Sequence, residues 1–297
     1  MKRLISLVLV STLTLGLQAQ LKPYVEAFRT DAPPTSVAQS IKDAAQANGL
    51  KVVGQYSPDT KIPRIVIVVT SDELINAVKK TGGLRGFAAT QRIAITQEGK
   101  SVVSFTNPAY WGNAYYQEDY PSVESLIKGS EQKVLATMKQ VGEVTLTPFG
   151  SEKGVKIDDL RDYQYMFGMP EFDDTVELES FGSYQEAKGK VDANLKKDRP
   201  GVSLVYRLEI PGKEITLYGI GLSGPTGESQ FMPIIDIGSP KHTAFLPYEL
   251  LVVGDEVHML HGRFRIALSF PDLTMGTFSK IMSTPGDIED LMEQLVE

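Results

Sequence analysis

An internal repeat is the feature that most constrains how this chain can fold. The segment from Gly86 to Trp111 aligns without gaps on the segment from Glu249 to Thr274, at an offset of 163 residues. Both segments have the pattern of a strand, a tight turn and a second strand, with the turns at Glu98-Gly99 and His261-Gly262. Glycine in such a turn favours a hairpin, because it adopts positive φ at little cost. We therefore expect one small domain to occur twice along the chain.

Further strands recur at matching places in the two halves. The first half is expected to have strands at 25–28, 50–56 and 64–70, and the second at 176–181, 202–209 and 214–222. The run of Val and Ile within 64–70 is typical of a strand that is buried on both faces.

Serine residues mark three expected helix starts. Ser36 and Ser183 each precede a Gln or Glu by three residues, which is the spacing of a capping box. Ser71 is expected to cap a helix over 72–80. The closing helices of the two halves are expected at 121–140 and 276–296, and the Gly- and Pro-rich stretch 224–240 predicts a loop.

This order of elements predicts an α+β fold with two tandem repeats of a small domain. In each repeat a mixed or antiparallel sheet is covered by helices, and the repeats are expected to be related by a pseudo-two-fold axis. The expected boundaries are 22–142 for the first repeat, 143–172 for a linker and 173–297 for the second repeat.

The same order resembles the bacterial "domain of unknown function 302" family. The helix start at 36–49, the hairpin at 87–106 and the Asn107-Pro108 step carry the resemblance, whereas the second half has Phe270-Pro271 without the Asn. The resemblance implies small α+β domains that dimerise, and it implies no activity because the role of the family is not established. On this reading the chain resembles a family dimer fused head to tail.

Residues 1–19 have the pattern of a secretory signal peptide. Lys2 and Arg3 precede the uncharged stretch 4–17, and Leu17-Gln18-Ala19 offers a cleavage site. An uncleaved anchor is the alternative. No later stretch is apolar enough to span a bilayer, so no stable membrane insertion is expected after cleavage. The predicted location is secreted or periplasmic.

Charge and cysteine content exclude several kinds of partner and site. Removal of residues 1–19 would change the net charge from −7 to −9, and an acidic surface repels nucleic acid. The chain has no cysteine, which excludes disulfides, thiolate metal sites and a cysteine nucleophile. No cofactor is predicted.

The second predicted hairpin suggests a ligand site. With a turn at His261-Gly262, His258 pairs with Arg265, and one face of the hairpin carries Glu256, His258, Arg263 and Arg265. Aliphatic residues stand at the corresponding places of the first hairpin. Arginine is suited to a carboxylate or phosphate, and histidine titrates near neutral pH. The alternative is an ordinary solvated face with weak ion pairs.

Two other motifs contain residue types found in metal sites or cofactor sites. His258, His261 and His242 are weak candidates for a metal site, since alternation along a strand separates the first two. The stretch Gly219–Gly224 matches a dinucleotide-binding string, but it runs into Pro225 rather than into a helix. It is interpreted as a strand that ends in a turn.

The aromatic segment around Tyr110 and Trp111 is a possible rim for a planar ligand. With Asn107 it offers flat rings and polar partners, although packing against the linker or the other repeat is the favoured interpretation. Our leading hypothesis is an exported binding or accessory module that holds a small anionic or planar ligand in a groove between its repeats. The alternatives are an enzyme with His258 as general base beside Arg265, and a structural or assembly partner. The expected state is a monomer with pseudo-dimer architecture, or a weak homo-oligomer.

Overall fold

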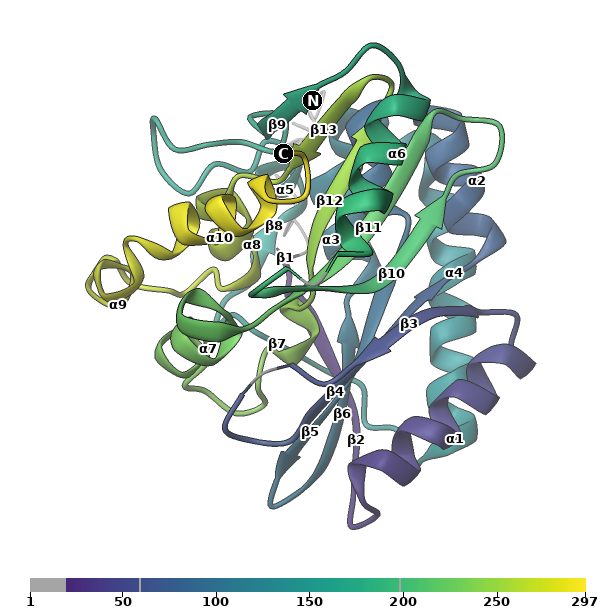
Figure 1. The fold of residues 1–297 in the computed structure, drawn as a ribbon. Coiled ribbons are helices and arrows are strands. Elements are labelled where there is room, and N and C mark those ends of the chain that lie inside the picture. The colour runs from purple at the N-terminus through teal and green to yellow at the C-terminus, as the bar shows by residue number, and fades with distance from the viewer. Residues whose placement is uncertain (1–19, 59, 198) are drawn as a thin grey trace, which may run out of the picture.

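A computed structural model describes residues 20–58, 60–197 and 199–297, and its α+β fold confirms the predicted fold class (Figure 1). The predicted signal peptide at 1–19 lies outside the described residues. Two large sheets dominate the structure. The first has the order β3 (Lys51–Tyr56), β4 (Arg64–Thr70), β5 (Gln91–Glu98), β6 (Lys100–Thr106), β2 (Tyr24–Thr30) and β7 (Thr147–Phe149). The second has the order β10 (Val202–Glu209), β11 (Ile215–Leu222), β12 (Tyr248–Val253), β13 (Glu256–Met259) and β9 (Val176–Ser180).

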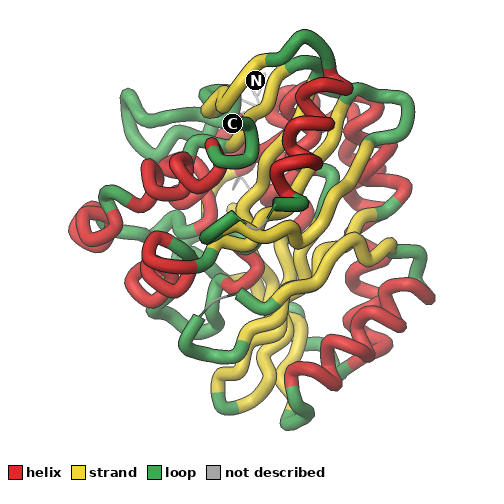
Figure 2. The backbone as a smooth tube through the Cα atoms, in the orientation of Figure 1, coloured by secondary structure: helices red, strands yellow, loops and turns green. Residues whose placement is uncertain are grey.

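Helices of both halves pack around the two large sheets (Figure 2). Those of the first half are α1 (Pro34–Ala47), α2 (Asp72–Thr81), η1 (Gly83–Ala88), α3 (Pro108–Tyr116) and α4 (Tyr120–Val141). Those of the second half are α6 (Tyr184–Leu195), α7 (Glu228–Ile235), η4 (Thr243–Phe245), α8 (Gly262–Ser269), α9 (Met275–Phe278) and α10 (Thr284–Glu293). Between the halves, α5 (Ile157–Arg161) follows a small sheet formed by β1 (Gln20–Leu21) and β8 (Val155–Lys156).

All neighbouring strands are antiparallel, and the two large sheets share their chain path apart from the added β7. Strand order β3-β4-β5-β6-β2 in the first sheet corresponds to β10-β11-β12-β13-β9 in the second. A bulge lies in β3 between Val52 and Gly54, and one lies in β10 between Leu204 and Tyr206. Strands β2 and β9 also carry matching bulges. Since a bulge displaces the register by one residue, its position provides a reference for aligning the sheets.

This reference makes Arg92 and Glu249 equivalent, so the ungapped alignment of Gly86 with Glu249 at an offset of 163 residues is wrong. Just after its bulge, β3 pairs Gly54 with Val68, and Val68 pairs with Arg92 across the next ladder. Just after its bulge, β10 pairs Tyr206 with Gly219, and Gly219 pairs with Glu249.

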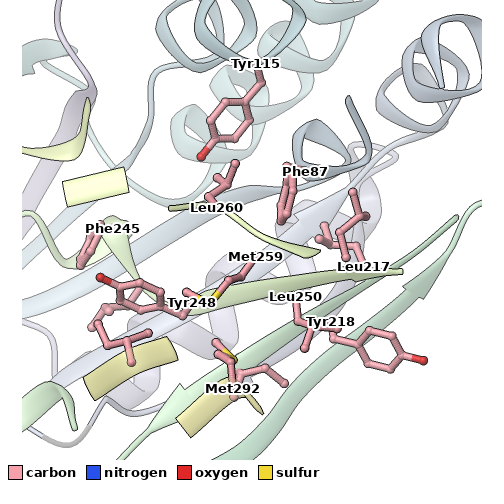
Figure 3. Close-up of a cluster of buried hydrophobic side chains, with 14 of the residues drawn as sticks. Phe87, Tyr115, Leu217, Tyr218, Phe245, Tyr248, Leu250, Met259, Leu260 and Met292 are labelled. Atoms are coloured by element: carbon pink, nitrogen blue, oxygen red, sulfur yellow. The ribbon is translucent and has the colours of Figure 1, made fainter. Parts of the chain in front are cut away.

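The first sheet is buried on both faces. Alternate residues of β4 point to opposite sides, as the Val- and Ile-rich run predicted. Ile65, Ile67 and Val69 belong to the core under α1 and α4, whereas Val66 and Val68 belong to the core shared with the second half. Figure 3 shows that shared core, where Phe87 and Tyr115 of the first half lie with Leu217 and Met259 of the second.

The two halves contact each other reciprocally. Strand β3 lies beside its counterpart β10, η1 packs on β11 and β12, and η4 packs on β4, β5 and β6. Such exchange of equivalent contacts is the pattern of an isologous dimer interface. The contact is close enough that a Cβ on Gly86 would lie 2.7 Å from Leu251 Cδ1.

The second predicted hairpin is wrong. Its turn lies at Gly254-Asp255, so that His258 pairs with Leu251 rather than with Arg265. Residues 262–269 form helix α8 instead of a strand. The alternation of apolar residues in this short stretch fits a strand or a helix, but the place beside β13 is taken by β9. The polar face proposed for Glu256, His258, Arg263 and Arg265 therefore does not exist.

Smaller corrections concern the first hairpin, one cap and two segments. In the first hairpin, pairing continues to Glu98 and Lys100 on either side of Gly99, so the turn is shorter than the predicted Glu98-Gly99 turn. Ser36 does not cap α1, which starts after Pro33; Ser183 accepts from Glu186 N at 3.3 Å, as predicted. Stretch 224–240 contains α7 in addition to loops, and 276–296 is broken into α9, a 3-10 turn and α10. No helix in the described ranges is long and apolar enough to cross a membrane.

Candidate functional site

Arg265 is buried in an ion network between the halves rather than exposed for a ligand. It is 2% exposed on α8 and donates through Nη1 to Glu249 Oε2 at 3.2 Å. Its Nη2 donates to the carbonyl of Phe245 at 2.7 Å and to that of Pro247. Glu249 also forms an ion pair with Arg92 and accepts from Tyr206 Oη at 2.5 Å. Arg265 therefore acts as an internal anchor that binds α8 to Glu249 and to the backbone near η4.

His258 faces other groups. Its Nε2 lies 2.9 Å from Glu256 Oε2 and its Nδ1 lies 3.1 Å from Thr175 Oγ1. His258 and Arg265 therefore share no hydrogen-bond partner among the described residues, and the paired constellation expected from the sequence is not assembled. Arg263 is exposed in the first turn of α8.

His261 has a local role at the start of the same helix. Its Nδ1 accepts from Arg263 N at 3.2 Å and so caps α8. Burial and the neighbouring Arg263 lower the pKa of His261. No group of three or more His, Asp or Glu side chains that could hold a metal ion is found among the residues the structure describes.

The aromatic segment packs inside the molecule. Asn107 caps α3 through Oδ1, which accepts from Ala109 N at 3.2 Å. Tyr110 Oη donates to Leu268 O and Trp111 Nε1 donates to Pro23 O, each at 2.8 Å. Tyr110 is fully buried. Tyr110 thus joins the first half to the second, and the segment packs inside the molecule as the packing alternative predicts.

A cavity of about 400 Å³ lies where the linker and the β11–β12 connection meet. The linker contributes Pro148 to Ser151, and the connection contributes Ile235 to His242. Lys22 enters from the first half, and Phe270 to Thr277 close the wall from the segment around α9. This size is within the range of small-molecule sites.

The wall of this cavity contains an oriented histidine. His242 Nδ1 lies 3.0 Å from Asp236 Oδ1, and the backbone N of His242 donates to the same oxygen at 2.8 Å. An ionised carboxylate only accepts hydrogen bonds, so His242 Nδ1 carries a proton, and the other ring nitrogen is Nε2. That Nε2 is buried and has no hydrogen-bond partner in the described part of the chain.

Arg64 and His242 stabilise the ionised form of Asp236. Arg64 Nη1 lies 2.5 Å from Asp236 Oδ2 and also donates to Thr243 Oγ1 at 2.9 Å. Burial alone would raise the pKa of Asp236, but the hydrogen bond from His242 and the charge of Arg64 outweigh burial and lower it. A residue of the first sheet therefore fixes the side-chain geometry of a site in the second half.

Three aromatic rings surround His242. Its ring centroid lies 4.6 Å from that of Phe270, 5.2 Å from that of Tyr24 and 5.7 Å from that of Phe149. Phe149 and Phe270 also line the cavity. The site thus offers flat apolar surfaces, which suit a planar molecule.

Sequence reasoning named only one member of this arrangement. His242 was considered as a weak metal candidate, whereas Asp236 and Lys22 were not singled out. The available signal was an isolated Asp in the Gly- and Pro-rich stretch 224–240, six residues before a histidine. The contribution of Arg64 could not be read from the sequence, because it comes from a strand of the other half.

Comparisons with known proteins find a partial similarity to a solved structure. Neither a protein-family model nor a curated protein matches the sequence. Among solved structures, the chain is similar to the crystal structure of uncharacterized conserved protein DUF302 from Bacillus stearothermophilus. The identity is 12% and the TM-score 0.35, over 40% of this chain and 98% of that chain.

Proposed function

We propose that this protein is an exported binding protein for a small planar anion, which occupies the cavity of about 400 Å³ beside His242. The observation that carries the proposal is the combination, in one cavity, of aromatic walls and an Asp236-oriented histidine. The site differs from the one expected at His258 and Arg265, although the ligand class is the same.

Lys22 is the cation that selects a negative charge. It lines the cavity, and no ion pair joins it to a carboxylate in the described ranges. Asp272, the acidic residue of the cavity wall, accepts from Ser151 Oγ at 2.9 Å and from the backbone N of Glu152 at 2.5 Å. These bonds give both Asp272 carboxylate oxygens a partner in the linker, whereas the amino group of Lys22 has no ion pair among the described residues.

The proposed architecture is two tandem copies of a DUF302-like domain that pack as a pseudo-dimer in a monomeric chain. The shared strand order, the matching bulges and the reciprocal contacts support it. The proposed domain limits are 22–142 and 173–297. Export rests on the pattern of residues 1–19, and sequencing the amino terminus of the secreted protein would test cleavage after Ala19.

Trp111 provides a reporter for ligand binding. The chain has one tryptophan, and the Tyr24 ring lies 6.2 Å from the Trp111 ring and 5.2 Å from the His242 ring. Benzoate, a planar anion, should change the fluorescence of Trp111 and raise the unfolding midpoint. Benzyl alcohol lacks the charge and cyclohexanecarboxylate lacks the flat ring, so each should bind more weakly.

A matched pair of lysine variants tests the role of Lys22. Lys22→Gln should lose the preference for benzoate over benzyl alcohol, while Lys156→Gln on strand β8 should retain it. If none of the three probes changes either signal in the unmodified protein, the cavity does not bind planar molecules and the proposed function is wrong.

A further inference from the structure

The two large sheets end differently at their outer edges. In the first half, β7 pairs with the outer side of β2 and is the last strand of its sheet. The counterpart of β2 in the second half is β9, and no strand pairs with the outer side of β9 in the described part of the sheet (Figure 1). An edge strand presents unpaired backbone N–H and C=O groups, so β9 can take up a further strand.

The bulges show which part of β9 corresponds to the paired part of β2. The extra residue of β2 is Ala27, whose carbonyl accepts from Thr145 N at 2.8 Å just before β7 begins. Strand β7 then pairs with residues 24–26. The extra residue of β9 is Leu178, so residues 175–177 are the counterpart of 24–26. The outer edge of β9 is therefore the place at which the first half holds β7.

The last strand of the first sheet is protected against further pairing, whereas β9 is less so. Strand β7 contains Pro148, which has no N–H to donate to another strand. Strand β9 has the sequence Val-Glu-Leu-Glu-Ser and contains neither proline nor lysine. Each of its residues can donate and accept one backbone hydrogen bond.

Acidic side chains determine which kind of strand can pair here. Glu177 and Glu179 are exposed and form no ion pair in the described ranges, and exposed Asp255 lies in the adjoining β12–β13 turn. In the first half, the counterpart of Glu177 is Glu26, which pairs with Arg29 at 2.8 Å. A second copy of β9 would bring like charges together, which is unfavourable. Lysine or arginine on an added strand would instead meet unpaired carboxylates.

We propose that β9 is a docking edge for an extended, lysine- or arginine-containing segment of another protein. The segment adds to the second sheet as an antiparallel strand, in the place that β7 has in the first sheet. Backbone hydrogen bonds hold the segment, and Glu177 and Glu179 select its charge. No residue of β9 lines the cavity beside His242, so this interaction does not depend on the proposed ligand.

A basic peptide, acetyl-Lys-Val-Lys-Val-Lys-amide, provides the probe. It should slow the hydrogen exchange of the amides of residues 176–180 and shift their NMR signals. The same peptide N-methylated at every residue keeps its charges but cannot donate backbone hydrogen bonds, so it should leave these amides unprotected. No protection by the first peptide, or equal protection by both, would overturn strand addition.

A double variant and a matched control test the role of charge. Glu177→Gln with Glu179→Gln should weaken binding of the basic peptide by about three- to tenfold at low salt. Glu118→Gln with Glu214→Gln removes two exposed carboxylates from other places and should leave the affinity unchanged. Equal losses in both double variants would show that net charge alone attracts the peptide, which would refute the site.

The protein without peptide tests the alternative of a second copy. The hydrogen exchange of residues 176–180 should not depend on protein concentration, because the glutamates of two β9 strands repel each other. Protection that rises with protein concentration would assign this edge to self-association and would contradict the basic partner.

Discussion

The sheets of the two halves have the same strand order, but the connection between the second and third strands of each sheet differs. In the first half this connection consists of α2 and η1, and Ser71 caps α2 by accepting from Leu74 N at 3.3 Å. In the second half the corresponding stretch contains α7, a loop and η4, and it contributes His242, which Asp236 orients, to the larger cavity. The strand order is therefore common to both halves, whereas the candidate site lies on a connecting segment that only the second half has in this form.

A second difference lies at the centre of the interface. Arg92 and Glu249 occupy equivalent positions of the two sheets, and they form an ion pair with each other. Two identical halves related by a two-fold axis would bring like charges together there. A single chain with two different halves can place opposite charges instead, which favours this pairing of halves over any pairing of identical ones.

Replacement of Glu249 should cause the largest loss in the free energy of unfolding. Glu249→Leu leaves Arg92 and Arg265 buried without their carboxylate, and the free energy of unfolding should fall by about 3–5 kcal/mol. Glu256→Gln changes a half-exposed carboxylate and should cost less than about 0.5 kcal/mol. Urea unfolding of both variants measures the difference. A loss for Glu249→Leu no greater than that of the control would mean that the central pair does not stabilise the interface.

Asp236→Asn should reduce stability by about 3 kcal/mol at neutral pH, because Arg64 keeps its charge without a counterion. The pKa of Asp236 is lowered in the folded state, so its contribution is complete above the ordinary carboxyl value of about 3.9. That contribution is lost as the pH falls from there through the folded-state value. The two proteins should therefore converge in stability at acid pH, as followed by unfolding at several pH values. A gap that stays constant down to acid pH would contradict the ion pair.

Gly54→Ala tests the close approach of β3 and β10. An added Cβ would lie 2.6 Å from Val205 O and 2.8 Å from Tyr206 Cβ, so backbone must move, at a cost of about 1–3 kcal/mol. Gly189→Ala lies on α6 with no atom near its added Cβ and should stabilise the protein by about 0.5–1 kcal/mol. Thermal unfolding should thus move in opposite directions for the two variants. A shift of the same sign would show that the strands can separate freely.

The smallest expected effect distinguishes the first helices of the two halves. Ser183→Ala removes the cap of α6 and should cost about 1 kcal/mol. Ser36→Ala should cost almost nothing, because α1 begins at Pro34 without a side-chain cap. Equal losses in denaturant unfolding would mean that the capping difference between the halves has no energetic consequence.

The large strands of both halves were predictable because their signals are local. The β-branched run at 64–70 predicted β4, and the predicted strand at 202–209 coincides with β10. The candidate site was not predictable in the same way. His242 was noted by its type, but Arg64 and Asp236 lie 172 residues apart in the sequence, and only the packing of η4 on the first sheet brings them together.

By itself, the sequence determined the fold class and the strands β2 to β6 and β9 to β11, since each depends on alternation and turn residues within short stretches. The tertiary structure decided whether residues 262–269 form a strand or a helix, because β9 takes the free edge of β13. It also decided that Arg265 is an internal anchor and that Asp236 orients His242. Buried charges must find partners wherever the folded chain brings them, and sequence distance does not limit that choice.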